Sequence, residues 1–254
     1  MANPILDFMP VSGQLTLVEA SLEDCQALLT STMAKHKTGR RLSLTIHQCT
    51  QGLRSAFGFL DPVYHLEGSR KLLIKTRHPK WVAVFNNSEY AAPAPKYFSA
   101  QLKTQAIGCR LQPDTLTQKN GKAHGRYGVL DFDYCVNGKQ ERVVGILHET
   151  SGWIFLNQGK PFSFEDKIRY RAKRISERFD AALLIHYLKA FNLHPFEDAF
   201  YRVDKKSPAV ILEMKWPGMN DPRPQPLEKL RRQSLLTPAF LGSIQRAINL
   251  QAAE

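Results

Sequence analysis

Asp204, Glu213 and Lys215 have the residue types and the approximate spacing of a metal-dependent nuclease site. Glu213 and Lys215 follow an apolar run at 208–212, and Asp204 precedes that run. Two carboxylates can hold Mg²⁺ while a lysine assists the attacking water molecule. The same acid-x-Lys spacing starts at Glu165 and again at Asp204, so the pattern has little specificity. It gives an alternative hypothesis, in which these three residues cleave nucleic acid.

A second pair of carboxylates, Asp131 and Asp133, lies two residues apart on a predicted strand. Side chains at this spacing point to the same face, where two carboxylates can bind a metal ion or transfer protons. The same alternation turns Leu130, Phe132 and Tyr134 toward the core and leaves the aspartates in water. We favour this second interpretation, in which both aspartates are solvated.

Cysteine and histidine are present, but not at the spacing of metal or redox sites. The four cysteines are scattered singly, and the eight histidines form no H-x-x-x-H or H-E-x-x-H pattern. No dinucleotide-binding glycine motif, Walker lysine loop or G-x-S-x-G elbow occurs either. We therefore expect no catalytic residue, no metal site and no cofactor, and free thiols at Cys25, Cys49, Cys109 and Cys135.

Charge is the unusual feature of the composition. The 254 residues include 35 Lys and Arg against 23 Asp and Glu, which gives a formal net charge of +12. Such a balance favours an acidic partner, whether phosphate, anionic lipid head groups or an acidic protein surface. The start of the sequence shows no secretory signal, and no apolar run is long enough to span a membrane. We therefore expect a cytoplasmic protein without a membrane partner.

Basic residues gather beside an apolar stripe between residues 164 and 180. Apolar side chains recur at steps of three and four, which predicts an amphipathic helix with a stripe of Phe164, Ile168, Ala172, Ile175 and Phe179. A basic edge repeats this step one position out of phase, at Lys167, Arg171, Arg174 and Arg178. Four acidic residues interrupt the edge and leave residues 160–180 with a charge of about +3, too little for strong phosphate-driven binding.

Strands and helices in mixed order must position these residues. Residues 1–112 alternate strand-like and helix-like segments, among them a helix that starts with a capping box at Ser21 and Asp24. Beyond a loop-like stretch at 111–128, Asn137-Gly138 predicts a β-hairpin within an antiparallel meander at 126–164.

We predict an α+β protein with mixed or antiparallel sheets. The helix at 164–180 and a second helix at 180–193 form a helical hairpin, and a C-terminal helix follows a proline-rich connector. Residues 1–112 form an N-terminal α/β half. Residues 113–254 hold the meander, the helical hairpin and the C-terminal helix, and we expect the two parts to pack as one unit.

Two segments resemble immunity proteins of bacterial polymorphic toxin systems. Residues 81–90 form a Trp-led strand that ends in asparagine, and residues 152–180 form a Trp-bearing hairpin that leads into Phe-Glu and an Arg-rich helix. The residues that carry the resemblance are Trp81, Phe85, Asn86, Asn87, Trp153, Phe164, Glu165, Tyr170, Arg178 and Phe179. The resemblance implies a stoichiometric inhibitor that binds a cognate toxin and has no catalytic activity of its own.

An inhibitor of this kind needs aromatic and arginine anchors on a preformed surface and charge that complements its target. A basic inhibitor fits an acidic or neutral protein partner. Nucleic-acid binding remains the alternative. Because acidic residues interrupt the basic edge, it is favoured less than binding to a protein. We expect at least one of the two tryptophans, Trp81 and Trp153, to be packed in the core. The candidate partner-binding residues are Trp81, Tyr90, Tyr97, Trp153, Lys167, Arg171, Arg174 and Arg178.

Overall fold

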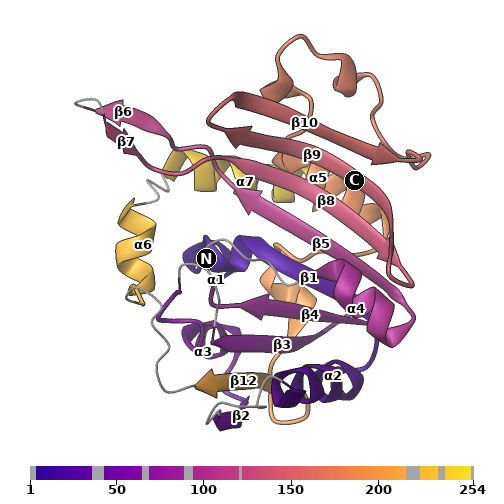
Figure 1. Ribbon diagram of the computed structural model, residues 1–254, viewed down its shortest axis with the longest axis vertical. Coiled ribbons are helices and arrows are strands. Elements are labelled where there is room, and N and C mark those ends of the chain that lie inside the picture. The colour runs from indigo at the N-terminus through magenta and orange to yellow at the C-terminus, as the bar shows by residue number, and fades with distance from the viewer. Residues whose placement is uncertain are drawn as a thin grey trace.

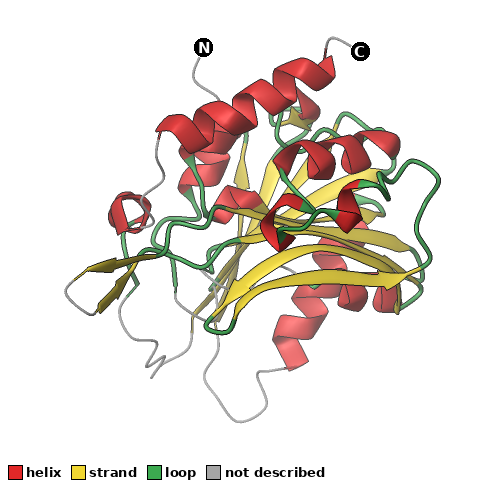
Figure 2. Cartoon of the chain, turned by 90° about the horizontal axis from the view of Figure 1, so that it is seen from above, coloured by secondary structure: helices red, strands yellow, loops and turns green. Residues whose placement is uncertain are grey.

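One large antiparallel sheet organises the molecule (Figure 1). The computed structural model describes residues 4–35, 43–64, 69–88, 94–119, 122–215, 224–233 and 238–252. The strands follow the order β10-β9-β8-β5-β1-β4-β3-β12-β2, and β11 also pairs with β3. Helices lie on both faces of the sheet (Figure 2), which confirms the predicted α+β class.

The ten strands of this sheet are β1 (Gln14–Glu19), β2 (Ser43–Cys49), β3 (Arg70–Thr76), β4 (Trp81–Asn86), β5 (Gln105–Gln112), β8 (Val129–Val136), β9 (Lys139–Glu149), β10 (Gly152–Gly159), β11 (Tyr201–Arg202) and β12 (Ala209–Lys215). A separate small hairpin consists of β6 (Thr117–Lys119) and β7 (Lys122–His124). Strands from residues 1–112 and from residues 113–254 are neighbours, because β5 pairs with β8 and β12 lies between β2 and β3. The two sequence halves therefore share the sheet.

The described helices are α1 (Pro4–Asp7), α2 (Leu22–Lys35), α3 (Leu53–Gly58), α4 (Pro95–Leu102), α5 (Ala181–Ala190), α6 (Leu227–Gln233) and α7 (Pro238–Ala252). Short 3₁₀ turns are η1 (Val11–Gly13), η2 (Arg169–Arg171), η3 (Ile175–Glu177) and η4 (Asp198–Phe200). The predicted C-terminal helix is confirmed as α7, and the second helix of the predicted hairpin is confirmed as α5.

The sheet separates two apolar clusters, and β4 contributes to both. Successive side chains of a strand point to opposite faces. Trp81, Ala83 and Phe85 therefore join the larger cluster, which includes residues of α1, α3, α5, α6 and α7. Val82 and Val84 join the smaller cluster, which α2 and α4 cover. All six residues of β4 are buried because helices shield both faces of this central strand.

Two local predictions are confirmed at atomic detail. The Ser21 hydroxyl oxygen accepts a 3.0 Å hydrogen bond from the Asp24 amide and donates to its carboxylate at 2.6 Å, so the capping box starts α2. Asn137 and Gly138 have φ angles of 51° and 84° in the turn that joins β8 to β9. Positive φ at both turn residues is what a two-residue hairpin requires.

The helix predicted at 164–180 is wrong. In its place the chain forms an irregular segment with the 3₁₀ turns η2 and η3, so the predicted helical hairpin does not exist. Phe179 is buried and Phe164 and Ile175 pack against the core, but Ile168 is 84% exposed. The apolar spacing satisfies a helical pattern, while hydrogen bonds to residues outside the segment fix a different backbone.

The expectation that Asp131 and Asp133 are solvated is also wrong for Asp131, which is only 5% exposed. It accepts a 2.8 Å hydrogen bond from Arg110 Nε on the neighbouring strand. Burial raises the pKa of the half-buried Asp133 carboxyl, although hydrogen bonds from Gln140 and Cys135 act in the opposite direction. The pairing of β5 with β8 places Arg110 beside the Asp131 carboxylate, which strand alternation alone assigns to solvent.

Two glycines at the ends of β10 provide a test of the local backbone. Gly152 and Gly159 both have positive φ, 110° and 85°. A Cβ at Gly152 would meet nothing within 4 Å, whereas a Cβ at Gly159 would collide with the carbonyl oxygen of Glu141. We expect Gly152→Ala to lower the free energy of unfolding by about 1–2 kcal/mol through backbone strain, and Gly159→Ala to lower it by at least about 1 kcal/mol more through the clash. Urea titration measures both; equal losses would contradict the close approach.

Candidate functional site

The aromatic residues selected from the sequence do not form one surface. Trp81 is 6% exposed and belongs to the larger core cluster, so it stabilises the fold and presents no docking face. Tyr97 is half-buried against the smaller cluster, and its hydroxyl group is hydrogen-bonded to Thr32. Tyr90 lies outside the described residues.

Trp153 takes part in a local aromatic group at the end of β10. Its ring stacks on His148, with ring centroids 4.7 Å apart and an interplanar angle of 7°. Tyr127 contacts the same imidazole edge-on at 5.4 Å, and Nδ1 of His148 lies 3.0 Å from a carboxylate oxygen of Asp114. These contacts leave Trp153 half-buried. Its side chain therefore packs on the strand pair β9–β10 and does not project from it.

The four selected basic residues lie in the irregular chain that follows β10, which we call the 160–180 segment. It lies at the top of Figure 1, beside the last strand at that end of the sheet. The segment contacts β10 directly: the Tyr170 ring lies 5.2 Å from the Phe155 ring, and the Arg178 guanidinium lies 5.5 Å from the centre of that same ring. The segment thus covers the β10 end of the sheet.

A buried ion pair between Arg142 and Glu165 attaches the 160–180 segment to the sheet. Both side chains have zero exposure. Arg142 Nε and Nη2 donate to the two carboxylate oxygens of Glu165 at 2.8 and 2.6 Å. The remaining donor, Nη1, reaches Asn157 Oδ1 at 2.7 Å and the Gln158 carbonyl oxygen at 2.9 Å. This two-pronged geometry satisfies both charged groups away from water.

Neighbouring groups complete the network around Glu165. Its carboxylate also accepts the Phe162 amide at 2.9 Å and the Tyr170 hydroxyl at 2.7 Å. The Tyr170 and Tyr187 hydroxyl groups are 2.7 Å apart, and Tyr187 also accepts the Asp166 amide at 3.1 Å. Glu165 is therefore tied to β9, and Asp166 and Tyr170 are tied to α5, by side-chain hydrogen bonds.

Electrostatics explains why Glu165 stays ionised in this position. Burial alone would raise the pKa of its carboxyl, but hydrogen bonds from Arg142, Phe162 and Tyr170, together with the Arg142 charge, lower the pKa below its ordinary value. Burial and the neighbouring Glu165 charge raise the pKa of Tyr170. Tyr170 therefore stays a neutral hydrogen-bond donor.

Two arginines of the segment hold its outer part together. Arg169 pairs with the Asp180 carboxylate and donates to the Glu177 carbonyl oxygen at 3.3 Å. Arg178 Nε donates to the Ala172 carbonyl oxygen at 3.0 Å. These contacts close the chain between the two 3₁₀ turns, so Arg178 has a structural role that the sequence did not indicate.

What remains exposed is an isoleucine among cations. Ile168 is 84% exposed and is flanked in sequence by Lys167 and Arg169. Arg171, Lys173 and Arg174 are exposed on the same segment. Arg174 lies 3.5 Å from Glu177, but no described acidic side chain forms an ion pair with Lys167, Arg171 or Lys173. We call Ile168 and the exposed cations Lys167, Arg171, Lys173 and Arg174 the Ile168 surface.

Sequence reasoning selected three of these cations but missed Ile168 and Lys173. It assigned Ile168 to the buried stripe because the residue fits a four-residue step from Phe164. The available signal was local: Ile168 is the only aliphatic residue in the run KIRYR at 167–171, and charge flanks it on both sides. An aliphatic side chain in such surroundings is poorly suited to a core.

The three nuclease candidates do not form one site, because Asp204 does not join Glu213 and Lys215. Asp204 lies in the turn before β12, where its carboxylate accepts the Lys206 and Ser207 amides at 2.7 and 2.9 Å. Glu213 is four residues into β12, which separates it from the start of that strand by roughly 13 Å. Its carboxylate accepts a 2.8 Å hydrogen bond from Arg70 and lies 3.4 Å from Lys215 Nζ. Burial tends to raise the pKa of Glu213, yet Arg70 and Lys215 hold it below its usual range.

Other reactive groups are enclosed as well. All four cysteines are buried and unpaired, as expected from their spacing. Burial raises the pKa of the Cys25 and Cys135 thiols to about 12, which suppresses the reactive thiolate. Within the part of the chain that the structure describes, no three His, Cys, Asp or Glu side chains are grouped to hold a metal ion.

Comparison with known proteins does not add to this description. No protein-family model, curated protein or solved structure matches the chain. Across the described ranges, no helix combines the length and apolar character needed to cross a lipid bilayer. The Ile168 surface is therefore the candidate site, on the evidence of its own exposure, charge and attachment.

We expect Glu165→Gln to release the 160–180 segment. Removing one charge of a buried pair leaves the other uncompensated and costs about 3–5 kcal/mol. Urea titration should show this loss, and trypsin should cut the variant faster after the basic residues of the segment. The control is Glu177→Gln in the exposed pair with Arg174, which should cost less than about 1 kcal/mol.

The effect of Glu165→Gln should depend on pH. Because the folded-state pKa of Glu165 lies below its ordinary value of 4.5, the carboxylate stabilises the native state above that value and loses this contribution as pH falls through the lowered pKa. The stability difference between wild type and variant should be largest at about pH 7 and should shrink at about pH 3. A difference that does not change over this range would contradict the ionised pair.

Proposed function

We propose that the chain is a cytoplasmic, non-catalytic binding protein, and more specifically an immunity protein that neutralises a cognate bacterial toxin by stoichiometric binding. One observation carries the proposal: an almost fully exposed isoleucine lies on a cation-rich segment that a buried ion pair fixes to the sheet. The resemblance of residues 81–90 and 152–180 to immunity proteins supports the specific form of the proposal.

The attachment of the segment favours binding without rearrangement. Ordering a loop on association costs free energy, and a loop held in advance avoids that cost. The Arg142–Glu165 pair and the Arg169 and Arg178 contacts hold the segment before any partner arrives. Ile168 can then enter an apolar pocket of the partner with little loss of conformational entropy.

Charge defines the kind of partner. Lys167, Arg171 and Lys173 form no ion pair with a described acidic side chain, so their charges can complement acidic groups on another molecule. The net charge of +12 adds long-range attraction to such a surface. We infer a protein whose binding site is an apolar pocket with an acidic rim.

Ile168 favours protein over nucleic acid as the partner. Single-stranded nucleic acid stacks its bases on aromatic side chains, and duplex DNA is held by cations that follow the phosphate backbone. None of the aromatic residues of the segment is exposed: Phe179 is buried, and Phe162, Phe164 and Tyr170 are partly buried in contacts with one another and with the core. The large apolar group that the segment leaves exposed, Ile168, is aliphatic, which suits an apolar protein pocket.

The first test is recovery of the partner. The tagged full chain, expressed in its own cells, should co-purify with one protein at an equimolar ratio. Co-expression should abolish the toxicity of that protein. Recovery of RNA or DNA alone, with affinity that falls steeply as salt rises, would contradict the proposal and favour nucleic-acid binding.

With the recovered protein as probe, we expect Ile168→Asp to weaken binding at least about 30-fold, the effect of losing a central anchor worth about 2 kcal/mol. Lys173→Glu should mainly slow association and reduce its dependence on salt. Calorimetry and stopped-flow kinetics measure the two effects. The control, Lys205→Glu, makes the same charge change on an exposed residue outside the segment and should leave association nearly unchanged.

A further inference from the structure

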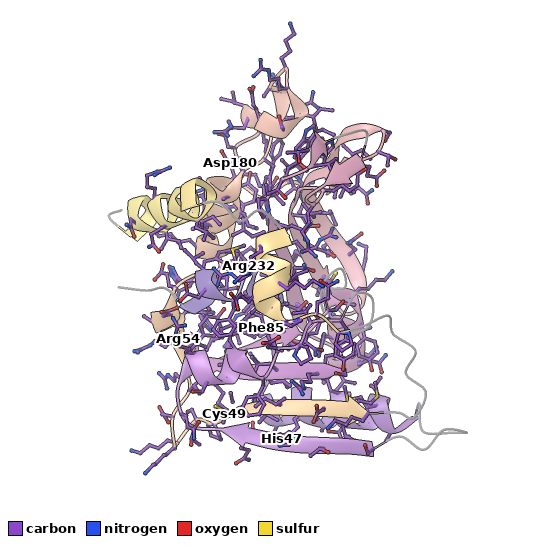
Figure 3. All side chains as sticks on the ribbon, turned by 90° about the vertical axis from the view of Figure 1, so that its left-hand side faces the viewer. His47, Cys49, Arg54, Phe85, Asp180 and Arg232 are labelled. Carbon is purple, nitrogen blue, oxygen red and sulfur yellow. The ribbon has the colours of Figure 1, made fainter. Side chains whose placement is uncertain are left out.

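The two edge strands of the large sheet, β10 and β2, have different surroundings. At one end the 160–180 segment lies against β10, and Arg142 binds carbonyl groups of that strand. At the other end β2, among the described strands, pairs with β12 alone. Figure 3 shows the two ends, with Asp180 of the 160–180 segment in the upper part and His47 of β2 at the bottom.

The hydrogen-bond pattern shows which backbone groups of β2 point outward. The Met214 amide donates to the Ser69 carbonyl oxygen at 2.8 Å, on the β3 side of β12. Met214 faces Leu44 in the β12–β2 register. In an antiparallel pair, facing residues turn their backbone groups either both toward each other or both away. The N–H and C=O groups of Leu44, and by alternation those of Ile46 and Gln48, therefore point away from β12.

The side chains of β2 lack the features that usually protect a sheet edge. Exposed edges commonly carry charges, proline or a bulge, which prevent pairing with another strand. The β2 sequence SLTIHQC has no Asp, Glu, Lys, Arg or Pro, and no register shift occurs in its pairing with β12. Its central residue, Ile46, is 44% exposed, and among the described residues only Ile168 is a comparably exposed large apolar side chain.

A groove runs beside this edge, between β2 and α2. Its volume is about 470 Å³, and its lining is mainly apolar. Small side chains of α2 form one wall of the groove, and Ile46 forms the other. Another protein surface can therefore approach this wall closely. The lining residues of α2 are Glu23, Gln26, Ala27, Thr30, Ser31 and Ala34.

We infer that a second copy of this chain docks on this edge, with the two β2 strands antiparallel about a two-fold axis through Ile46. The seven-residue strand is centred on Ile46, so the axis places Ile46 against Ile46 of the second copy and Leu44 against its Gln48. A second β2 strand supplies the extended backbone partner and the apolar side chain that this edge can pair with. The two Ile46 side chains then cover each other beside both grooves.

Charge makes β2 the favourable place for such contact. Two copies at +12 repel each other over most of their surface. A strand without formal charge allows close approach, and its outward N–H and C=O groups gain partners across the axis. The dimer has one continuous sheet, with the two 160–180 segments at its opposite ends, so it presents two Ile168 surfaces at once. This inference does not depend on the proposed function.

Matched variants at the two exposed isoleucines test the dimer. Light scattering of the wild-type chain should give twice the 28.9 kDa monomer mass. Ile46→Asp should give the monomer mass, because it places two carboxylates together at the axis, and circular dichroism should show that it remains folded. Ile168→Asp should remain a dimer. A wild-type monomer, or a folded Ile46→Asp dimer, would overturn the inference.

Cross-linking tests the register. Facing hydrogen-bonded residues have Cα atoms about 5.5 Å apart, within the range that a disulfide spans. Ile46→Cys should therefore form a covalent dimer under mild oxidant, and the buried native cysteines should not interfere. Gln48→Cys is the matched control on the same strand face, because the two-fold axis separates its two copies by roughly 13 Å. Equal cross-linking at both positions would contradict the two-fold register.

Discussion

The Arg142–Glu165 pair is the interaction on which the candidate site depends. Two opposite charges with no solvent exposure can persist only when each is fully hydrogen-bonded. Here the guanidinium bridges the carboxylate and the end of β10, while Phe162 and Tyr170 use the remaining carboxylate capacity. The pair joins residues 23 positions apart. It therefore fixes the irregular 160–180 segment in one position on the sheet.

The large sheet provides the frame for this arrangement. Helices cover both faces of its centre, which is why β4 is buried along its whole length. Toward β10 the covering element changes from helix to the 160–180 segment, whose aromatic residues pack around Tyr187 and Phe191 of the α5 region. The molecule thus uses regular structure to build its core and irregular structure to build the Ile168 surface.

The sequence predicted the parts of the fold that local rules determine. Strand alternation, the Ser21–Asp24 capping box and the Asn137-Gly138 turn each depend on residues close together in the chain, and each is present. The 164–180 helix failed for a non-local reason. A repeat of apolar residues is also compatible with an irregular segment when a buried partner such as Arg142, outside the repeat, sets the backbone.

The site was predictable to the same limited degree. The cations Lys167, Arg171 and Arg174 were identified because charge can be read directly from the residues. Core packing was expected for at least one tryptophan, but the choice of Trp81 and the exposure of Ile168 could not be identified, since they depend on which residues the folded chain brings above them. Asp131 shows the same limit, because the pairing of β5 with β8 brings Arg110 to its carboxylate.

Different residues of the 160–180 segment fix its backbone and form its exposed surface, and this separation has an evolutionary consequence. Glu165, Arg169 and Arg178 hold the backbone, whereas Lys167, Arg171 and Lys173 make no ion pair with any described acidic residue. Substitution at the second group can therefore change the charge of the surface while the shape of the segment persists. A lineage of such chains could vary this surface through a few codons, because the buried contacts that fix the backbone involve other residues.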